Sequence, residues 1–157
     1  MGLVFESNRD GTCTVVGIGT CKDKVIVIPR TSPDGDTVVA IGNSAFEKCS
    51  PQISEVIIPD TVTKIGNWAF RYCSSLSGLD IPASVTDLGT GALYGCNNLT
   101  TLTIRSTTVV GYPFAESIRN DTSDYVSAIY VPANLVDTYK NNGNWAIIAG
   151  KIQAISK

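Results

Sequence analysis

The chain has 157 residues, enough for one domain of ordinary size. Its net charge is −2, and only 17% of its residues are charged, against roughly 25% in typical soluble domains. This balance excludes an electrostatic grip on nucleic acid or on an anionic membrane surface as the main activity. The absence of histidine also excludes Ser–His and Cys–His nucleophile pairs and histidine-ligated metal sites. No apolar run is long enough for membrane insertion.

The aliphatic residues favour β-structure over long helices. There are 16 Ile and 15 Val against 8 Leu. Branching at Cβ suits the pleated surface of a sheet and lowers helix propensity. We therefore expect many short strands.

The first elements are a predicted hairpin and a strand. Residues 3–5 and 13–16 flank a turn sequence at 8–11, so an antiparallel hairpin is expected over 3–19. The run VIVIP at 25–29 then predicts the first strand of a longer series.

The middle of the chain is an internal repeat. One block reads IGNSAFEKC at 41–49, IGNWAFRYC at 65–73 and LGTGALYGC at 88–96, so its cysteines are 24 and 23 residues apart. A second block, out of phase with the first, reads VIIP at 56–59, LDIP at 79–82 and LTIR at 102–105. A period of 23–24 residues is typical of one coil of a solenoid, whose units bury their apolar faces only by stacking.

Each repeat predicts a strand, a turn, a second short strand and a short helix. The run at 79–82 alternates in polarity and ends at Pro82, which has no N–H for a sheet ladder, and 85–88 alternates again. Within 69–73 the spacing of small, aromatic and cysteine side chains indicates one or two helical turns with one side inward. The aligned positions that we expect to be buried are Ile41, Ile65, Leu88, Phe46, Phe70 and Leu93.

The end of the chain departs from the repeat. The pattern weakens over 105–125, returns once at 128–132, and gives way to a predicted helix over 133–142. We expect a single repeat domain over 1–157, in which 3–29 are the N-terminal hairpin cap and first strand, 30–131 the repeats and 132–157 a C-terminal helical cap.

The signature IPxxVTxIGxxAFxxCxxL at 58–76 resembles the BspA-like leucine-rich repeat family, a class of bacterial cell-surface proteins. The segments at 17–21 and 129–133 are similar to pieces that flank these repeats. The resemblance implies a leucine-rich repeat solenoid, a right-handed β/α superhelix. It also implies a secreted or surface-exposed binding module that adheres to a host matrix protein, a glycan or a partner cell. The family has no common enzyme activity, so the resemblance implies no catalytic residue and no cofactor.

The start of the chain bears on the expected location. The first residues lack the charged and apolar regions of a signal peptide. We therefore expect a trimmed form or a fragment of a longer surface protein, located outside the cell or at its surface. A cytosolic protein is the alternative.

The cysteines form one predicted column. Cys49, Cys73 and Cys96 follow the repeat, and Cys21 is expected to join them, whereas Cys13 lies in the hairpin. We interpret the column as buried thiols, because no histidine or Cys-x-x-Cys motif supports a metal or redox site. A disulfide between Cys13 and Cys21 is an alternative for a secreted protein.

Two surfaces are candidate binding sites. The first consists of Trp68, Arg71, Tyr72 and Tyr94 on the predicted short helices, because aromatic residues and arginine are enriched in interface hot spots. The alternative is that these aromatic side chains only cover apolar edges between coils. The second surface consists of the outward positions of the main strands, Glu55, Ile57, Asp80, Thr103 and Tyr130.

We expect a protein or glycan partner on the predicted helix face. Glu55 and Asp80 do not predict a glycosidase, because no further acid accompanies them. The alternative function is a structural stalk or accessory segment of a larger surface protein, with no ligand of its own. A contiguous aromatic or apolar patch would favour binding, and evenly polar faces would favour the stalk.

Overall fold

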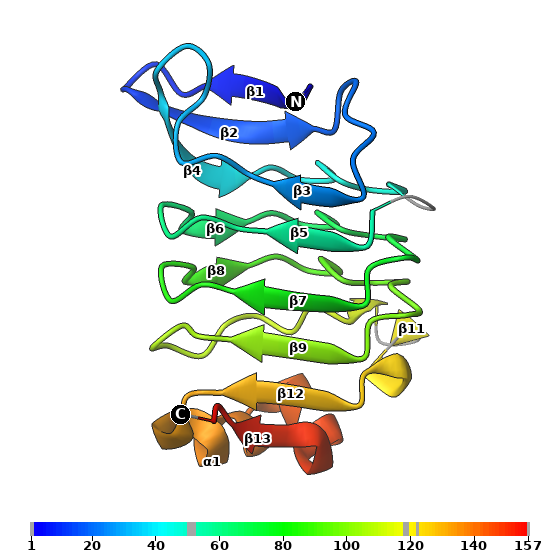
Figure 1. Ribbon diagram of the computed structural model, residues 1–157. Coiled ribbons are helices and arrows are strands. Elements are labelled where there is room, and N and C mark those ends of the chain that lie inside the picture. Colours follow the sequence, from blue (N-terminus) through cyan, green and yellow to red (C-terminus); the bar gives the residue numbers. More distant parts are fainter. Residues whose placement is uncertain (1, 50–52, 118–119, 122, 157) are drawn as a thin grey trace.

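The computed structural model is a stack of coils whose strands lie side by side along its length (Figure 1). The structure describes residues 2–49, 53–117, 120–121 and 123–156. One sheet contains, in order, β1 (Val4–Ser7), β2 (Thr12–Gly17), β4 (Thr37–Ile41), β6 (Lys64–Ile65) and β8 (Asp87–Leu88). The other strands of the coils form a pair, β3 (Val25–Val27) and β5 (Glu55–Ile57), and a four-stranded sheet, β7 (Gly78–Ile81), β9 (Thr101–Ile104), β12 (Ala128–Val131) and β13 (Ile152–Ala154).

Strand pairing between coils is parallel, because each coil returns the chain to the same side in the same direction. Ile81 of β7 lies opposite Ile104 of β9, 23 residues later. Lys64 of β6 lies opposite Asp87 of β8, and the two form an exposed ion pair with 3.9 Å between Nζ and Oδ2. In these coils, the 23–24-residue period of the sequence therefore determines which residues lie opposite each other in neighbouring strands.

The two ends of the stack differ from its middle (Figure 1). The predicted hairpin is confirmed, since β1 and β2 pair antiparallel. A small hairpin, β10 (Ala115–Ser117) and β11 (Asn120–Asp121), and a 3-10 turn, η1 (Ser123–Tyr125), precede β12. The helix predicted over 133–142 is divided into a 3-10 turn, η2 (Ala133–Leu135), and a short α1 (Val136–Lys140), and η3 (Gly143–Lys151) follows.

The C-terminal elements pack against the segment 105–125, in which the repeat pattern weakens, and form hydrogen bonds with it. Tyr139 and Trp145 are buried. The Tyr139 hydroxyl accepts a hydrogen bond from the Val110 N–H at 3.1 Å, and Trp145 Nε1 donates to the Val110 carbonyl at 3.0 Å. These two side chains fix the backbone at Val110, and the Leu93 N–H still donates to the Pro113 carbonyl at 3.0 Å, as in the preceding coils.

The predicted core column is confirmed. All six aligned positions are at most 4% exposed, and they are Ile41, Ile65, Leu88, Phe46, Phe70 and Leu93. The rings of Phe46 and Phe70 stack across adjacent coils, with centroids 5.3 Å apart and planes within 6°. The apolar face of each coil is therefore covered by the next coil, as the repeat requires.

The predicted short helix of each repeat is wrong. Residues 42–48 and 66–72 form consecutive turns instead. Ser44, Lys48, Trp68 and Tyr72 have φ between 55° and 60°, the left-handed region that interrupts any right-handed helix. In the third coil the same two positions are glycines, Gly91 and Gly95, which adopt this region without steric cost.

Hydrogen bonding explains why turns replace the helix. The Phe46 N–H donates to the Ala69 carbonyl of the next coil at 2.7 Å, and the Phe70 N–H donates to Ala92 at 2.8 Å. Alternate N–H groups, such as that of Cys49, close the turns by donating to the carbonyl three residues earlier. A helix would direct all of these groups along its own axis, so the turns are what allow the coils to bond to each other.

A column of glycines lets successive backbones approach. A Cβ at Gly66 would lie 2.4 Å from Asn43 Oδ1 and 2.6 Å from the Asn43 N, and one at Gly89 would lie 2.4 Å from the Asn67 N. The asparagines use this closeness, since Asn43 Oδ1 accepts the Asn67 N–H at 2.8 Å. The asparagines of the recurrent Ile-Gly-Asn sequence thus form a ladder of hydrogen bonds from coil to coil.

Because the phenylalanine rings are buried and stacked, truncating one of them should destabilise the protein strongly. Phe70→Ala should lower the free energy of unfolding by about 3–5 kcal/mol, because it removes a buried ring and leaves a cavity. Urea denaturation measures this loss, and Ile147→Ala at an exposed position is the control. A loss below about 1 kcal/mol for Phe70→Ala would show that the column is not the core.

The glycine column predicts a position-specific effect of one methyl group. Gly66→Ala should destabilise the protein by about 1–3 kcal/mol, because the added Cβ meets backbone that cannot move independently. Gly150→Ala is the matched control, since nothing lies within 4 Å of its added Cβ. Equal melting temperatures for the two variants would contradict the close approach of the coils.

Candidate functional site

Three of the four residues of the first candidate surface lie together on the turns. The Arg71 guanidinium carbon lies 4.8 Å from the ring centroid of Tyr72 and 5.9 Å from that of Tyr94. The two rings meet edge to face at 5.6 Å. Arg71 Nη1 also forms an ion pair with Glu47 Oε1 at 3.0 Å. Glu47 was missed by the sequence prediction, although it occupies the position of Arg71 in the preceding coil.

The aromatic rings of this surface cover the glycines of the following coil. A Cβ at Gly91 would lie 2.7 Å from Trp68 Cδ1, and one at Gly95 would lie 2.3 Å from Tyr72 Cδ1. Trp68 is half-buried in this position. Part of the surface that these rings could offer a partner is therefore covered within the protein, although Tyr72 remains 37% exposed.

The second candidate surface lies on the main strands, and we call it the strand face. One row of its outward positions contains Val25, Glu55, Gly78, Thr101 and Ala128, and the other contains Val27, Ile57, Asp80, Thr103 and Tyr130. Ala128 is buried, whereas the other side chains are exposed or half-buried. The five residues predicted for this surface therefore share one face.

A hollow of about 670 Å³ lies on the strand face, over β5, β7 and β9. Glu55 and Ile57 line it on one side, Thr101 and Thr103 line it on the other, and Gly78 lies between them. Tyr130 is not part of its lining. In the described residues β5 and β7 share no strand ladder, and the Ser77 N–H reaches the Ser54 carbonyl at 3.4 Å.

Two carboxylates line the hollow, Glu55 and Asp80, and they differ in their ion pairing. Arg105 donates to both carboxylate oxygens of Asp80, from Nε at 2.8 Å and from Nη2 at 2.9 Å. These hydrogen bonds and the charge of Asp80 raise the pKa of Arg105 above its usual value. Glu55 forms no ion pair within the described parts of the chain. Among the described residues, the hollow therefore has one carboxylate with an ion-pair partner, Asp80, and one without, Glu55.

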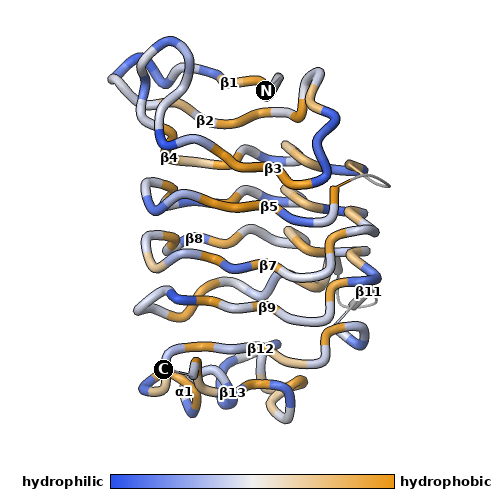
Figure 2. Tube along the Cα trace, in the orientation of Figure 1, coloured by the Kyte–Doolittle hydropathy of each residue, from blue (hydrophilic) through white to orange (hydrophobic). Residues whose placement is uncertain are grey.

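An apolar patch adjoins the hollow. Val25, Val27 and Ile57 are 42%, 49% and 46% exposed, and Val27 lies directly opposite Ile57. Figure 2 shows β3 as a continuous hydrophobic segment. The sequence prediction missed Val25 and Val27, although the unbroken apolar run at 25–28 could have indicated them, because alternate positions of a strand point outward.

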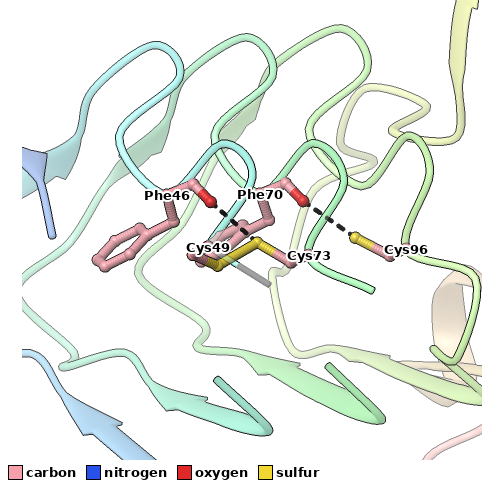
Figure 3. Close-up of a disulfide and its surroundings, with 5 residues drawn as sticks. All are labelled: Phe46, Cys49, Phe70, Cys73 and Cys96. Carbon is pink, nitrogen blue, oxygen red and sulfur yellow. Dashed lines mark hydrogen bonds between the residues drawn. A yellow bond between two sulfur atoms is a disulfide. The ribbon is translucent and has the colours of Figure 1, made fainter. Parts of the chain in front are cut away.

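The cysteine column contains a disulfide, so its interpretation as thiols alone is wrong. Cys49 and Cys73 are bonded, and the 24-residue repeat brings their Cα atoms to 5.3 Å, within the usual range for a disulfide (Figure 3). The Cys96 thiol donates to the Phe70 carbonyl at 3.0 Å, and burial raises its pKa to about 12. Cys13 and Cys21 are buried thiols, so the alternative Cys13–Cys21 disulfide is not formed.

Neither a cluster of metal-ligating side chains nor a membrane-spanning helix occurs in the described part of the chain. It contains no group of three or more His, Cys, Asp or Glu side chains that could hold a metal ion. None of its helices has the length and hydropathy needed to cross a bilayer.

Parallel strands stacked over a buried aliphatic and aromatic column, with a central period of 23–24 residues, are typical of leucine-rich repeat proteins. The BspA type Leucine rich repeat region matches residues 30–122 in six copies, and the chain belongs to this family. Leucine-rich repeat proteins are typically non-enzymatic modules that bind protein partners.

Solved structures have the same fold. A leucine-rich repeat protein from Bacteroides capillosus ATCC 29799 is 29% identical, with a TM-score of 0.67 over 82% of this chain and 93% of that one. A leucine rich cell surface protein from Faecalibacterium prausnitzii A2-165 is 27% identical, with a TM-score of 0.57 over 81% of this chain and 42% of that one. The T. pallidum Leucine Rich Repeat protein, 17% identical, shares the fold with a TM-score of 0.60 over 84% of this chain and 70% of that one. No match was found among curated proteins.

The disulfide gives a prediction about thiol content and stability. Of the five cysteines, three should react with a thiol reagent in denaturant without reductant, and all five should react after reduction. Reduction should lower the free energy of unfolding by about 2–4 kcal/mol, because it releases a 24-residue constraint on the unfolded chain. Five reactive thiols before reduction would contradict the bond. Cys49→Ser is the matched control, because its stability should not change with reductant.

Proposed function

We propose that the chain is a secreted or cell-surface module that binds a partner protein on its strand face. The single observation that carries the proposal is the hollow of about 670 Å³ beside the exposed patch of Val25, Val27 and Ile57. Exposed apolar side chains grouped on one surface and bordered by polar groups are typical of protein interaction sites. Adhesion to a host matrix protein, a glycan or a partner cell is the form of binding that the family resemblance suggests.

The strand face is favoured over the surface formed by Trp68, Arg71, Tyr72 and Tyr94. Arg71 already pairs with Glu47 and lies against two tyrosine rings. A partner that used this arginine would first have to replace those contacts, so part of its binding energy would be lost. The surface formed by these four residues remains the second candidate.

The stalk alternative is less well supported than binding. A stalk without ligand has no need of an apolar patch, and evenly polar faces would keep it soluble. The location proposed here is supported by similarity to the Faecalibacterium prausnitzii protein, whose description is a leucine rich cell surface protein. This chain spans less than half of that protein, so its role within a longer molecule is part of the proposal.

We propose recognition and no reaction on the strand face. The strand face has two carboxylates in the hollow, and Asp80, one of them, accepts hydrogen bonds from Nε and Nη2 of Arg105. A carboxylate fixed in this way is not available as a nucleophile or a general base without breaking the pair. The groups of the hollow are therefore suited to recognition.

The test is a comparison of two sets of exposed valine and isoleucine substitutions. Val27→Thr/Ile57→Thr removes the patch but keeps side chains branched at Cβ, which suit a strand. Val4→Thr, at an equally exposed position on β1 of the other sheet, is the matched control. Binding is measured to immobilised extracellular-matrix proteins and to bacterial cells.

We expect the wild type to bind at least one of these surfaces and the double variant to bind at least about tenfold more weakly, because the lost contacts lie at the centre of the interface. The Val4→Thr variant should bind like the wild type. Loss of binding on Tyr72→Ala alone would move the site to the turns. A folded wild type that binds none of the surfaces would overturn the proposal in favour of the stalk.

A further inference from the structure

The geometry of the hollow points to its occupant: an extended segment of the partner protein that crosses Gly78 and places a lysine or arginine side chain on Glu55. This inference rests on the proposed function and specifies the chemistry of the partner at the same site. It is carried by the absence of a side chain at Gly78, by the charge of Glu55 and by the spacing of Glu55 and Ile57 along β5.

The fold does not require glycine at position 78. Gly78 does not have a positive φ, and the atoms nearest to an added Cβ are Thr101 Oγ1 at 3.2 Å and the Thr101 carbonyl oxygen at 3.8 Å. The hydroxyl can rotate away, in contrast to the backbone atoms that crowd Gly66 and Gly89. Glycine inside a strand weakens it and often marks a place where a ligand or another backbone approaches closely.

The missing side chain leaves a slot of suitable width. Neighbouring strands are roughly 4.8 Å apart, so the side chains on the two strands that flank β7 are separated by about twice that distance. One extended chain fits between them. The Asp80–Arg105 pair lies further along β7 and bounds the slot at that end. The slot is therefore open toward the beginning of β7, where Gly78 lies.

The charge of the slot selects a cationic partner. Glu55 lines it without an ion pair among the described residues, whereas Asp80 is compensated by Arg105. Covering Glu55 with an apolar or acidic segment would remove its water without supplying a counter-charge, which is unfavourable. A lysine or arginine side chain supplies that charge and a hydrogen-bond donor.

The spacing on β5 specifies a pattern in the partner. Glu55 and Ile57 are two residues apart, so their side chains point to the same side of the strand about 7 Å from each other. In an extended partner the side chains of residues i and i+2 have the same separation. The expected recognition pattern is therefore a basic residue, any residue, and then an aliphatic or aromatic residue that lies on Ile57 and Val27.

The test uses three synthetic nonapeptides that differ at one position. Their central residues are Lys-Thr-Val, Gln-Thr-Val and Glu-Thr-Val, flanked by glycine and serine. Each is titrated into the ¹⁵N-labelled full chain, and the affinity is measured from amide chemical shifts. The Lys-Thr-Val peptide should shift Gly78, Thr101 and Thr103, and it should bind about twofold to fivefold more tightly than the Gln-Thr-Val peptide, the range of an exposed ion pair.

Two variants and one control variant distinguish the effect of charge from that of shape. Glu55→Gln should abolish the preference for lysine, whereas Asp87→Asn, which removes an exposed carboxylate from the other sheet, should preserve it. Gly78→Val should fill the slot and weaken binding of every peptide at least about tenfold, because the closest approach of the two backbones is blocked. Its melting temperature should stay close to that of the wild type, because valine favours strands and the atom that has to move is the Thr101 hydroxyl oxygen. An unchanged melting temperature would show that the loss of binding is not caused by unfolding.

Equal affinity for the lysine and glutamate peptides would overturn the inference, and so would shifts confined to Tyr72 and Tyr94. Failure of the inference and of the proposed function can be told apart. If Val27→Thr/Ile57→Thr loses partner binding while the peptides show no charge preference, the strand face binds a partner of another chemistry. If that double variant keeps full binding, the strand face is not the site, and both proposals are wrong.

Discussion

The hydrogen bonds between consecutive coils are the interactions on which the structure depends. Turn N–H groups such as that of Phe70 donate to the carbonyls of the next coil, and the asparagine ladder adds further bonds on the same side. They form only because the backbones approach at Gly66 and Gly89 and because the turns direct alternate N–H groups outward. The buried column of phenylalanines and isoleucines then follows from the stacking, since each coil covers the apolar side of its neighbour.

This arrangement separates the residues that hold the fold from those that can recognise a partner. The inward positions and the glycines are constrained by contacts in both neighbouring coils. The outward positions of the strand face are constrained by little except strand propensity, so they can differ from coil to coil. Gly78 is the clearest case, because it does not have a positive φ and the atom nearest to an added Cβ is a side-chain oxygen, Thr101 Oγ1 at 3.2 Å. The turn surface is intermediate, since its aromatic rings cover glycines of the adjacent coil.

The repeat period could be read from the sequence, and with it the strand register, the core column and the outward positions. Three features could not be predicted in this way. Apolar residues at 69–73 have the same spacing in a helix and in consecutive turns, and only the left-handed φ of Trp68 and Tyr72 distinguishes them. The period brings both Cys49 and Cys96 next to the coil of Cys73, and it does not say which of them bonds. The hollow includes Gly78, and a single missing side chain at one position carries no periodic signal.

The coil-to-coil hydrogen bonds can be observed directly as scalar couplings across the bond in a long-range HNCO spectrum. We predict a correlation from the Phe70 amide nitrogen to the carbonyl carbon of Ala92, and one from Phe46 to Ala69. These correlations would show that the turn segments bond to the next coil. Correlations from Phe70 to Gly66 instead, four residues earlier in the same coil, would indicate a helix and contradict this account of how the stack is held together.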